Sequence, residues 1–558
     1  MNRELNAFSE REFDLLIVGA GIYGAAAAWD AALRGLSVAL IDKGDFGGAT
    51  SQNSLKIIHG GLRYLQQVDV VRMVESIRER RLLMAIAPHL VHPLCCVMPT
   101  TGFLMKGRPV MQIGLLINDI VGFNRNWTAD PQKRIPRSRV VSKEVCMGLI
   151  PGLDDRKVTG GALWTDGQVY STERLLLAFV VSAAQAGAVC ANYAEAVRFL
   201  KVEDRVHGVE ARDRLTGKAF EIRSKTVINA SGGWVDSLLA KGVSNVKRVR
   251  LSTAMNLVIR RDILPECAAG LTSHFQYRSK DRRMTQGSRM LFMTPWHQIT
   301  LVGTHHRPYD GDPDDMTVTE AEIQAFMDEV NAAYPGTVIR REDVGFFYKG
   351  FLPMDGIHSK TGEVQLTKHY RFYDHGREDG VSGLFSVVGV KYTTARDVAK
   401  KIVDLVCAKS KLKAKPSASH KTPVVGGDIE RFGPFLAGAL SKTPPGISPD
   451  TQRHLVHQYG TEHKRILEWA DKHPIWRKLL PGSKEVIAAE IIHAIREEAA
   501  VKLSDAVMRR TDLGAGGHPG DSCLKACAAL MAQELGWDAA REKKEIDETK
   551  AVFMPGRG

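Results

Sequence analysis

The segment "SLKIIHGGLRYL", residues 54–65, places basic side chains, a histidine and two adjacent glycines inside a short apolar run. Adjacent glycines let a ligand approach the backbone closely, because no Cβ atom stands in the way. The same pair is also a common marker of a plain turn before a helix. From these residues alone, both interpretations stay open.

A second group of residues could bind phosphate. From Phe13 the sequence reads "FDLLIVGAGIYGAAAAWDAALRGLSVALIDKGD". Gly19 permits a tight turn, Gly21 lets a pyrophosphate approach, and Gly24 lets helix and strand pack closely. The following helix directs its N-terminus at the phosphates, and Asp42 is placed to hydrogen-bond a ribose hydroxyl. This βαβ context predicts a dinucleotide site, but the fingerprint fits NAD and FAD alike.

Two later segments favour a flavin. "KTVINASGGWVD", residues 225–236, is an apolar strand that runs into a turn of small residues. "GLFSVVGVKYTTARDVAKKIVDLV", residues 383–406, is a strand, a glycine turn and a helix starting near Thr393 or Thr394. The positive end of that helix, with Lys391 just before it, would stabilise the negative charge of a reduced flavin. An NAD-linked dehydrogenase would leave "GVKYTTAR" unexplained.

Together with "GATSQNSLKIIHGGLRYL", these segments resemble the FAD-dependent, quinone-linked glycerol-3-phosphate dehydrogenases, within the D-amino-acid-oxidase-like flavoproteins. The resemblance covers nearly the whole chain and includes "PWHQITLVGT" and "LSDAVMRRTDLG". It implies an α/β fold in which a Rossmann-like FAD-binding domain is interleaved with a mixed β-sheet substrate domain. A C-terminal all-helical cap domain would follow. The glycines of the opening segment would then admit an isoalloxazine ring.

The resemblance also implies which residues contact FAD. They are Gly19, Gly21, Gly24, Asp42, Thr50, Ser51, Lys56, His59, Gly60, Gly61, Ser231, Gly232, Gly389, Lys391, Tyr392 and Thr393.

By the same resemblance, Arg63, Tyr64 and Lys391 would hold a substrate phosphate, for which guanidinium geometry is well suited. Leu352, in "KGFLPM", stands where the family's "SGVRPL"-like segment has a substrate-binding arginine, and Lys349 is a displaced replacement. A leucine cannot bind phosphate. A substrate other than glycerol 3-phosphate therefore stays open.

The family's catalytic histidine, in a "KGSH"-like segment, corresponds to Asn256 in "STAMNLVI". A "GTTD"-like turn reads Gly303-Thr304-His305-His306 here, and Thr304 is expected to contact substrate. Histidine readily accepts a hydroxyl proton near neutral pH, so His305 or His306 could supply the base. A pair of solvated loop histidines is the alternative.

The predicted catalytic residues are thus Arg63, Lys391, His305 and His306. The predicted activity moves hydride from a carbinol C–H of a polyol phosphate to flavin, and electrons on to quinone or another acceptor. The alternatives are the same chemistry on a different, non-phosphorylated hydroxy substrate, and a flavin-binding protein without turnover.

Length and composition indicate the number of domains, the kind of partner and the location of the protein. A chain of 558 residues is too long for one core, and a net charge of +13 favours anionic partners. A charged N-terminus and no membrane-spanning run predict a cytoplasmic protein. Eight scattered cysteines predict reduced, buried thiols and no metal site. The basic runs "RRMTQGSRM" and "KRIPRSRVVSK" lack interleaved aromatics, so no nucleic-acid partner is expected.

Pattern changes divide the chain into a FAD-binding and substrate region over residues 1–410, a linker over 409–427 and a helical domain over 428–558. The linker is rich in lysine, serine and proline. Thr319 and Glu322 have capping-box spacing. Two hairpins are expected, one around "LTGK" and one in "RMLFMTPWHQITLVGTHH".

The run "KGRPVMQIGLLINDIVGF", residues 106–123, is too short to span a bilayer but could lie in its interface. The family uses a comparable surface to reach membrane quinone. A buried amphipathic helix is the alternative, and a homodimer is a further open expectation.

Overall fold

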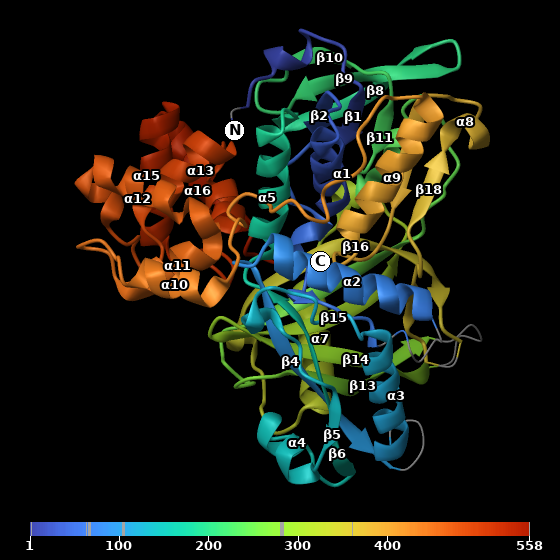
Figure 1. Cartoon of the computed structure of the whole chain (residues 1–558), viewed down its shortest axis with the longest axis vertical. Coiled ribbons are helices and arrows are strands. Elements are labelled where there is room, and N and C mark those ends of the chain that lie inside the picture. The colour runs from blue at the N-terminus through green and yellow to red at the C-terminus, as the bar shows by residue number, and fades with distance from the viewer. Residues whose placement is uncertain are drawn as a thin grey trace.

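The structure of the chain is a computed structural model, and it describes residues 1, 3–62, 64, 69–102, 107–278, 284–359 and 361–556. Two strand-containing layers are stacked along the long axis of the molecule, and a group of helices from the last third of the chain packs beside them (Figure 1). The predicted α/β class with a helical C-terminal part is confirmed.

The upper layer carries the predicted βαβ unit. Over the described residues it is a six-stranded sheet in the order β18-β19-β11-β1-β2-β7, parallel except at β18. Its strands are β1 (Leu15–Val18), β2 (Val38–Ile41), β7 (Val189–Ala191), β11 (Val227–Asn229), β18 (Arg371–Asp374) and β19 (Leu384–Val388). Strands covered on both faces need apolar residues throughout, and "LLIV" and "VALI" supply them.

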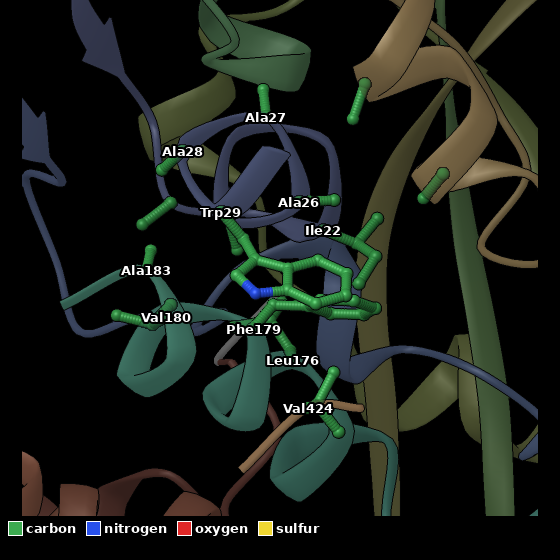
Figure 2. Packing of buried hydrophobic residues seen from close by; sticks show 14 of the residues in the cluster. Ile22, Ala26, Ala27, Ala28, Trp29, Leu176, Phe179, Val180, Ala183 and Val424 are labelled. Atoms are coloured by element: carbon green, nitrogen blue, oxygen red, sulfur yellow. The ribbon is translucent and has the colours of Figure 1, made fainter. Parts of the chain in front are cut away.

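Helices α1 (Ile22–Leu33), α5 (Thr172–Gln185) and α9 (Ala395–Ser410) pack together against this sheet. The run of alanines in α1 lets its neighbours approach on nearly every side. Trp29 packs against Phe179 of α5, with their rings centred 5.2 Å apart (Figure 2). Val424, from the segment after α9, joins the same core. The N-terminus of α1 is thereby fixed at the end of β1.

The lower layer is a mixed sheet with ten strands in its described part. They are β3 (Ile57–Ile58), β4 (Val91–Thr101), β5 (Arg139–Val141), β6 (Val158–Val169), β12 (Leu251–Ile259), β13 (Ala268–Arg278), β14 (Met284–Trp296), β15 (Ile299–Tyr309), β16 (Val344–Ile357) and β17 (Val364–Leu366). A small antiparallel sheet adds β8 (Ala194–Val202), β9 (Arg205–Asp213) and β10 (Ala219–Arg223). Both predicted hairpins, β9–β10 and β14–β15, are confirmed.

Shorter or peripheral helices flank these sheets. They are α2 (Val70–Ile86), α3 (Arg108–Val121), α4 (Lys143–Leu149), α6 (Val235–Leu239), α7 (Glu320–Ala333) and α8 (His375–Glu378). Thr319 and Glu322 form the predicted capping box of α7. Helix α9 begins at Ala395, directly after Thr394, close to the start near Thr393 or Thr394 that the sequence predicted. None of the described helices combines the length and the apolar character needed to cross a membrane.

The last helices are α10 (Phe432–Leu440), α11 (Pro449–Tyr459), α12 (His463–Lys472), α13 (Ala488–Glu498), α14 (Leu503–Asp505), α15 (Asp521–Leu535) and α16 (Ala539–Ala551). Apolar residues of α13, α14 and α15 form one cluster with Leu301 and Phe346 of the lower sheet. The predicted linker is not detached, because Ser419 is buried and donates to the carboxylate of Asp30 in α1. The predicted domain boundaries themselves stay predictions.

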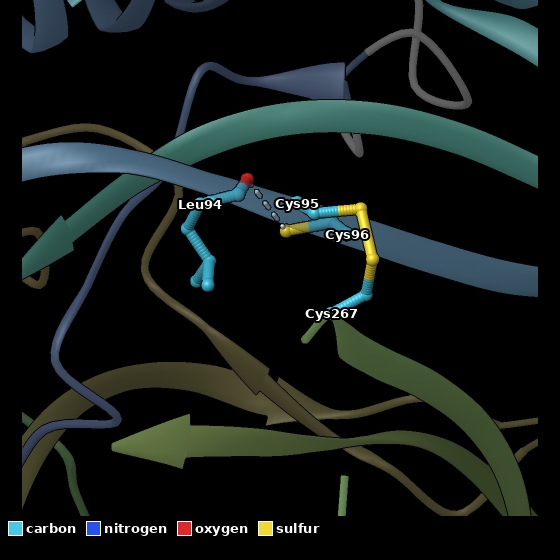
Figure 3. Close-up of a disulfide and its surroundings, with 4 residues drawn as sticks. All are labelled: Leu94, Cys95, Cys96 and Cys267. Carbon is cyan, nitrogen blue, oxygen red and sulfur yellow. Dashed lines mark hydrogen bonds between the residues drawn. A yellow bond between two sulfur atoms is a disulfide. The ribbon is translucent and has the colours of Figure 1, made fainter. Parts of the chain in front are cut away.

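The expectation of reduced thiols is wrong for one pair. Cys95 of β4 and Cys267, next to β13, form a disulfide with their Cα atoms 4.6 Å apart (Figure 3). The two residues are 172 positions apart in sequence, and the parallel pairing of β4 with β13 brings them together. No spacing rule along the chain could show this contact. The other cysteines are free, as expected.

Candidate functional site

A cavity of about 810 Å³ opens where β1, β2 and β11 end. Predicted cofactor residues from four separate segments line it together: Gly19, Gly21, Asp42, Thr50, Ser51, Ser231 and Gly232. Ligands of open α/β sheets bind at the carboxyl ends of the strands, so this is the expected place for a dinucleotide.

Each of the three fingerprint glycines is required for a different reason. Gly19 has φ +103°, and a Cβ there would lie 2.6 Å from the carbonyl oxygen of Ala230. A Cβ on Gly24 would lie 1.8 Å from the carbonyl oxygen of Gly19. A Cβ on Gly21 would meet only Ser51 Oγ, at 3.2 Å, and would occupy the cavity side. The protein's own packing requires Gly19 and Gly24, whereas Gly21 keeps space open for a ligand.

Asp42 lines this cavity, directly after β2. Its carboxylate accepts hydrogen bonds from the backbone N–H groups of Ala20, at 2.6 Å, and Gly44, at 2.8 Å. Burial nevertheless raises the pKa of Asp42 to about 6. With the N-terminus of α1 for phosphates and this carboxyl group for a ribose, the residues fit the adenosine diphosphate part of FAD.

A second cavity, of about 760 Å³, lies between the opening segment, the lower sheet and α3. Its wall is mainly apolar and aromatic, and it includes Leu55, Met98, Leu115, Trp164, Met290 and Phe292. Five residues named from the sequence also line it: His59, Gly61, Tyr64, Thr304 and His306. An apolar cavity with a few convergent polar groups is typical of a small-molecule site.

His59 is the best-positioned polar group of this second cavity. Its side chain is 48% exposed, and Nδ1 lies 3.3 Å from Asp166 Oδ2. Asp166 is buried and also accepts from Gly60 N, Arg80 Nη1 and Trp164 Nε1. Burial alone would raise the pKa of Asp166, but the bond to His59 and the charge of Arg80 lower it to about 2. A charged carboxylate therefore orients His59 through Nδ1, which leaves Nε2 for a substrate.

The structure shows why positions 60 and 61 of the opening segment are both glycines. A Cβ on Gly60 would lie 2.1 Å from Arg80 Nη1 and 2.9 Å from Asp166 Oδ1. Gly61 has φ +88°, and a Cβ there would lie 3.0 Å from Met73 Cα of α2. The protein's own groups thus occupy the place of a Cβ at both glycines, and the approach of their backbone to an isoalloxazine ring stays a prediction.

The prediction that Lys56 contacts FAD is also corrected, because its ammonium group is bound to α5. The side chain is fully buried, and Nζ lies 2.6 Å from Glu173 Oε1 and 2.8 Å from Thr172 Oγ1. The rings of Trp296 and Tyr348 enclose the same ammonium, at 5.1 and 4.8 Å from their centroids. The side chain of Lys56 thus ties the opening segment to α5 and does not line either cavity.

The predicted turn near Lys391 closes on the opening segment. Thr393 Oγ1 accepts from the backbone N–H of His59, at 3.1 Å. Lys391 Nζ lies 3.8 Å from the centroid of the Tyr64 ring. Burial, together with the charge of Arg72, lowers the pKa of Lys391 to about 8. Lys391 therefore stands behind Tyr64 as seen from the cavity, and Arg63 lies outside the described residues.

The other residues of this turn make protein contacts. The backbone of Lys391 is held by Tyr23, whose hydroxyl donates to the carbonyl oxygen at 3.0 Å and accepts from the N–H at 3.1 Å. Gly389 leaves room for Tyr23, because a Cβ there would lie 2.4 Å from the hydroxyl oxygen. Tyr392 donates to the carbonyl oxygen of Thr172. Its hydroxyl is therefore engaged with α5.

Strand alternation separates the remaining candidates. His306 and Thr304 line the second cavity, whereas His305 points to the other face of the sheet. There, His305 Nδ1 lies 2.7 Å from Arg289 Nη2, and its ring packs on Phe326 of α7. The prediction of His305 as a base is corrected on this ground.

Lys349 likewise cannot replace an arginine at position 352. The two residues are three positions apart on β16, so their side chains leave opposite faces of the strand. Lys349 Nζ donates to the carbonyl oxygen of Met316. Asn256 accepts from Thr304 Oγ1, at 2.8 Å, and donates to Asn53 Oδ1, at 2.7 Å. Asn256 is thereby a support for a cavity residue.

Sequence reasoning missed Asp166 and its neighbours Trp164 and Arg80. The one signal was "LWTDG", an acidic residue inside a strand otherwise buried on that side. It also missed the C-terminal residues Lys502, Ser504 and Arg509, which line the first cavity. No pattern along the chain connects residue 42 with residue 509.

Comparison with known proteins gives consistent matches. Residues 14–391 match the family described as "FAD dependent oxidoreductase", and residues 417–542 match "C-terminal domain of alpha-glycerophosphate oxidase". The chain is 31% identical over 550 residues to a glycerol-3-phosphate dehydrogenase from Synechocystis sp., covering 96% of this chain and 95% of that protein. It is 31% identical to the mitochondrial glycerol-3-phosphate dehydrogenase of Mus musculus, covering 97% of this chain and 73% of that protein.

Among solved structures, the fold is similar to the glycerol-3-phosphate dehydrogenase from Bacillus halodurans complexed with FAD. The TM-score is 0.75 at 24% sequence identity, and the match covers 98% of this chain and 96% of that chain.

Proposed function

The chain belongs to the family of FAD-dependent glycerol-3-phosphate dehydrogenases, and from this premise we propose that it oxidises the carbinol group of glycerol 3-phosphate. The family matches confirm the resemblance drawn from the sequence motifs and make the chain an FAD-dependent oxidoreductase. Electron transfer to quinone and the individual residue roles are our proposals.

The observation that carries the proposal is a half-exposed His59 in an apolar cavity, with its Nδ1 against buried Asp166. Oxidation of an alcohol requires loss of the hydroxyl proton, and a histidine so oriented accepts it on Nε2. The charged Asp166 stabilises the imidazolium that results. We assign His59 as the general base, in place of His305 or His306, which were named from the sequence.

Other residues orient and attract the substrate in this proposal. Tyr64, Thr304 and His306 line the same cavity and supply polar groups near His59. Lys391 contributes a positive charge behind Tyr64, where it attracts an anionic phosphate. FAD would be held by the wall of the 810 Å³ cavity, and when bound it supplies the acceptor for the electrons of the C–H bond.

Anaerobic flavin reduction tests this function directly. The FAD-loaded protein is mixed with glycerol 3-phosphate, with glycerol, and with other polyols and their phosphates, and the absorbance of oxidised flavin is followed. We expect glycerol 3-phosphate to bleach the flavin faster than glycerol does. His59→Gln should keep FAD but slow bleaching by about 10²–10⁴-fold, the usual contribution of a general base. Faster bleaching by glycerol, or unchanged bleaching in the variant, would refute the substrate or the base respectively.

We further propose that the protein lies peripherally on an anionic membrane face. Helix α3 exposes Val110, Ile113, Leu116, Ile117 and Ile120, and Phe123 and Trp127 extend this apolar surface. The exposed arginines Arg108, Arg134, Arg137 and Arg139 lie in the same stretch of chain. Apolar residues with a basic rim are typical of helices that lie in the membrane interface. Lys106, part of the sequence argument, lies outside the described residues.

The same helix joins this surface to the second cavity. Val110, Ile113 and Ile117 are exposed and also line the cavity wall. An apolar electron acceptor such as quinone would therefore enter from the membrane side. The expected homodimer stays a prediction.

Sedimentation with vesicles tests the membrane proposal. We expect binding to vesicles containing anionic phospholipid at low salt, and loss of binding in Ile113→Lys/Ile120→Lys. The matched control is Ile475→Lys, an exposed isoleucine on the C-terminal helices. Equal binding of all three proteins, or no binding of the unmodified chain, would exclude the α3 surface.

A further inference from the structure

Residues of the C-terminal helical domain form part of the wall of the first cavity. Lys502 just before α14, Ser504 within it and Arg509 after it line the cavity together with Gly21 and Asp42. Lys502 Nζ is 3.0 Å from Glu548 Oε2, and its side chain is 27% exposed. A cation in this wall stands where a pyrophosphate-bearing ligand is expected. The cavity is therefore built by two domains.

A buried ion network anchors the loop after β2 to this helical domain. Asp45, three residues after Asp42, accepts from Arg510 Nη1 and Nη2 at 2.7 and 2.8 Å, and from Arg509 Nε. The side chains of Asp45 and Arg510 are 1% and 0% exposed. Burial would raise the pKa of Asp45, but the two arginines hold it well below its ordinary value. The network is fully charged, so separating the domains would leave these groups unpaired.

A second tie runs through Tyr193, which also lines the cavity. Its hydroxyl donates to Asp505 Oδ1 of α14 at 2.5 Å, and its backbone N–H donates to the carbonyl oxygen of Gly44. Tyr193 has φ +54°, a conformation that costs energy in a residue with a Cβ and that surrounding contacts must hold. Asn192 beside it donates to Asp45 and to the carbonyl oxygen of Ala499.

We propose that the C-terminal helical domain completes the FAD site, so that its docking and the retention of FAD stabilise each other. The inference rests on the FAD cavity and is independent of the substrate. Lys502 attracts the negative pyrophosphate, while Arg509, Arg510 and Asp505 position Asp45 and Tyr193. Any energetic coupling of this kind is reciprocal: bound FAD holds the domain in place, and the docked domain slows the release of FAD.

Release of FAD from the purified holoprotein tests the direct contact. The rate is followed as the rise of flavin fluorescence after dilution, without any substrate. Lys502→Gln should release FAD on the order of fivefold faster, because one charge-assisted contact is lost. Lys525→Gln, which removes an exposed lysine of α15 outside the cavity, should release FAD at the rate of the unmodified protein.

Hydrogen exchange on the unmodified chain tests the coupling without relying on a variant. Removal of FAD should increase exchange over residues 499–512 by about tenfold or more, while α7, which does not contribute to the cavity, should be unchanged. Equal FAD release in Lys502→Gln and Lys525→Gln would overturn the direct contact. Equal protection of 499–512 with and without FAD would overturn the coupling, whatever substrate the enzyme oxidises.

Discussion

Replacement of Asp166 by asparagine separates the structural and catalytic consequences of one buried carboxylate. Asp166 is 4% exposed and receives hydrogen bonds from Gly60 N, Arg80 Nη1 and Trp164 Nε1, besides its contact with His59. An asparagine side chain at this position could accept through only one oxygen and would leave the Arg80 guanidinium buried without its counter-charge. Breaking a buried pair in this way costs about 3–5 kcal/mol.

The pH dependence of this stabilisation follows from the lowered pKa. In the folded protein the pKa of Asp166 is about 2, against an ordinary 3.8. The carboxylate therefore stabilises the fold at pH values above about 4, and this contribution is lost as the pH falls through 2. Asp166→Asn should remove the stabilisation at neutral pH, where chemical denaturation measures it.

The same change should affect catalysis through His59. Without the charged carboxylate at Nδ1, the imidazole loses its fixed tautomer and orientation, and kcat should fall by about 10²–10⁴-fold with FAD still bound. Asp154→Asn is the control, since Asp154 pairs with Arg156 on the surface and its loss should leave stability nearly unchanged. A variant that folds, binds FAD and keeps kcat within about twofold of the unmodified enzyme would refute the role assigned to His59 and Asp166.

The remaining predictions concern the cofactor, the phosphate charge and the core. Gly21→Val should give stable, colourless protein because the side chain enters the cavity, whereas Gly24→Ala should prevent folding by its clash at 1.8 Å; flavin content and circular dichroism distinguish them. Because the pKa of Lys391 is about 8, KM for an anionic substrate should rise above pH 8, and this rise should be absent in Lys391→Met. Lys56→Met should lower the free energy of unfolding by about 3–5 kcal/mol by leaving Glu173 unpaired, and Glu173→Gln in the same chain should restore part of it; urea denaturation measures both.

Much of the fold could be predicted from short-range patterns. The apolar strand, the glycine spacing and the alanine-rich helix predicted the βαβ unit, because these residues act through neighbours that are close in sequence. Thr319 with Glu322 was predicted for the same reason: a helix cap depends on neighbours within one turn. These residues needed no knowledge of distant contacts.

The site was predicted only where its residues belong to one segment. His59 and Tyr64 were found because they lie in one motif, but the purpose of Gly60 was not, since Arg80 and Asp166 come from other elements. Lys56 was expected at the cofactor because the resemblance to the family implied it. Its partner Glu173 is 117 residues away, and no local pattern reveals it.

The sequence by itself determined the elements, the dinucleotide site and the family, since these depend on spacing within a strand, a turn or a helix. Tertiary structure decided which face each side chain occupies and which distant partner it meets. His305 and His306 are neighbours on β15, yet His306 lines the cavity and His305 contacts Arg289, because successive side chains of a strand point to opposite faces. Asp45 contacts Arg510, 465 positions away, only because the last helices fold back onto the first strands. No local sequence pattern predicts such a contact, since it depends on how distant segments pack.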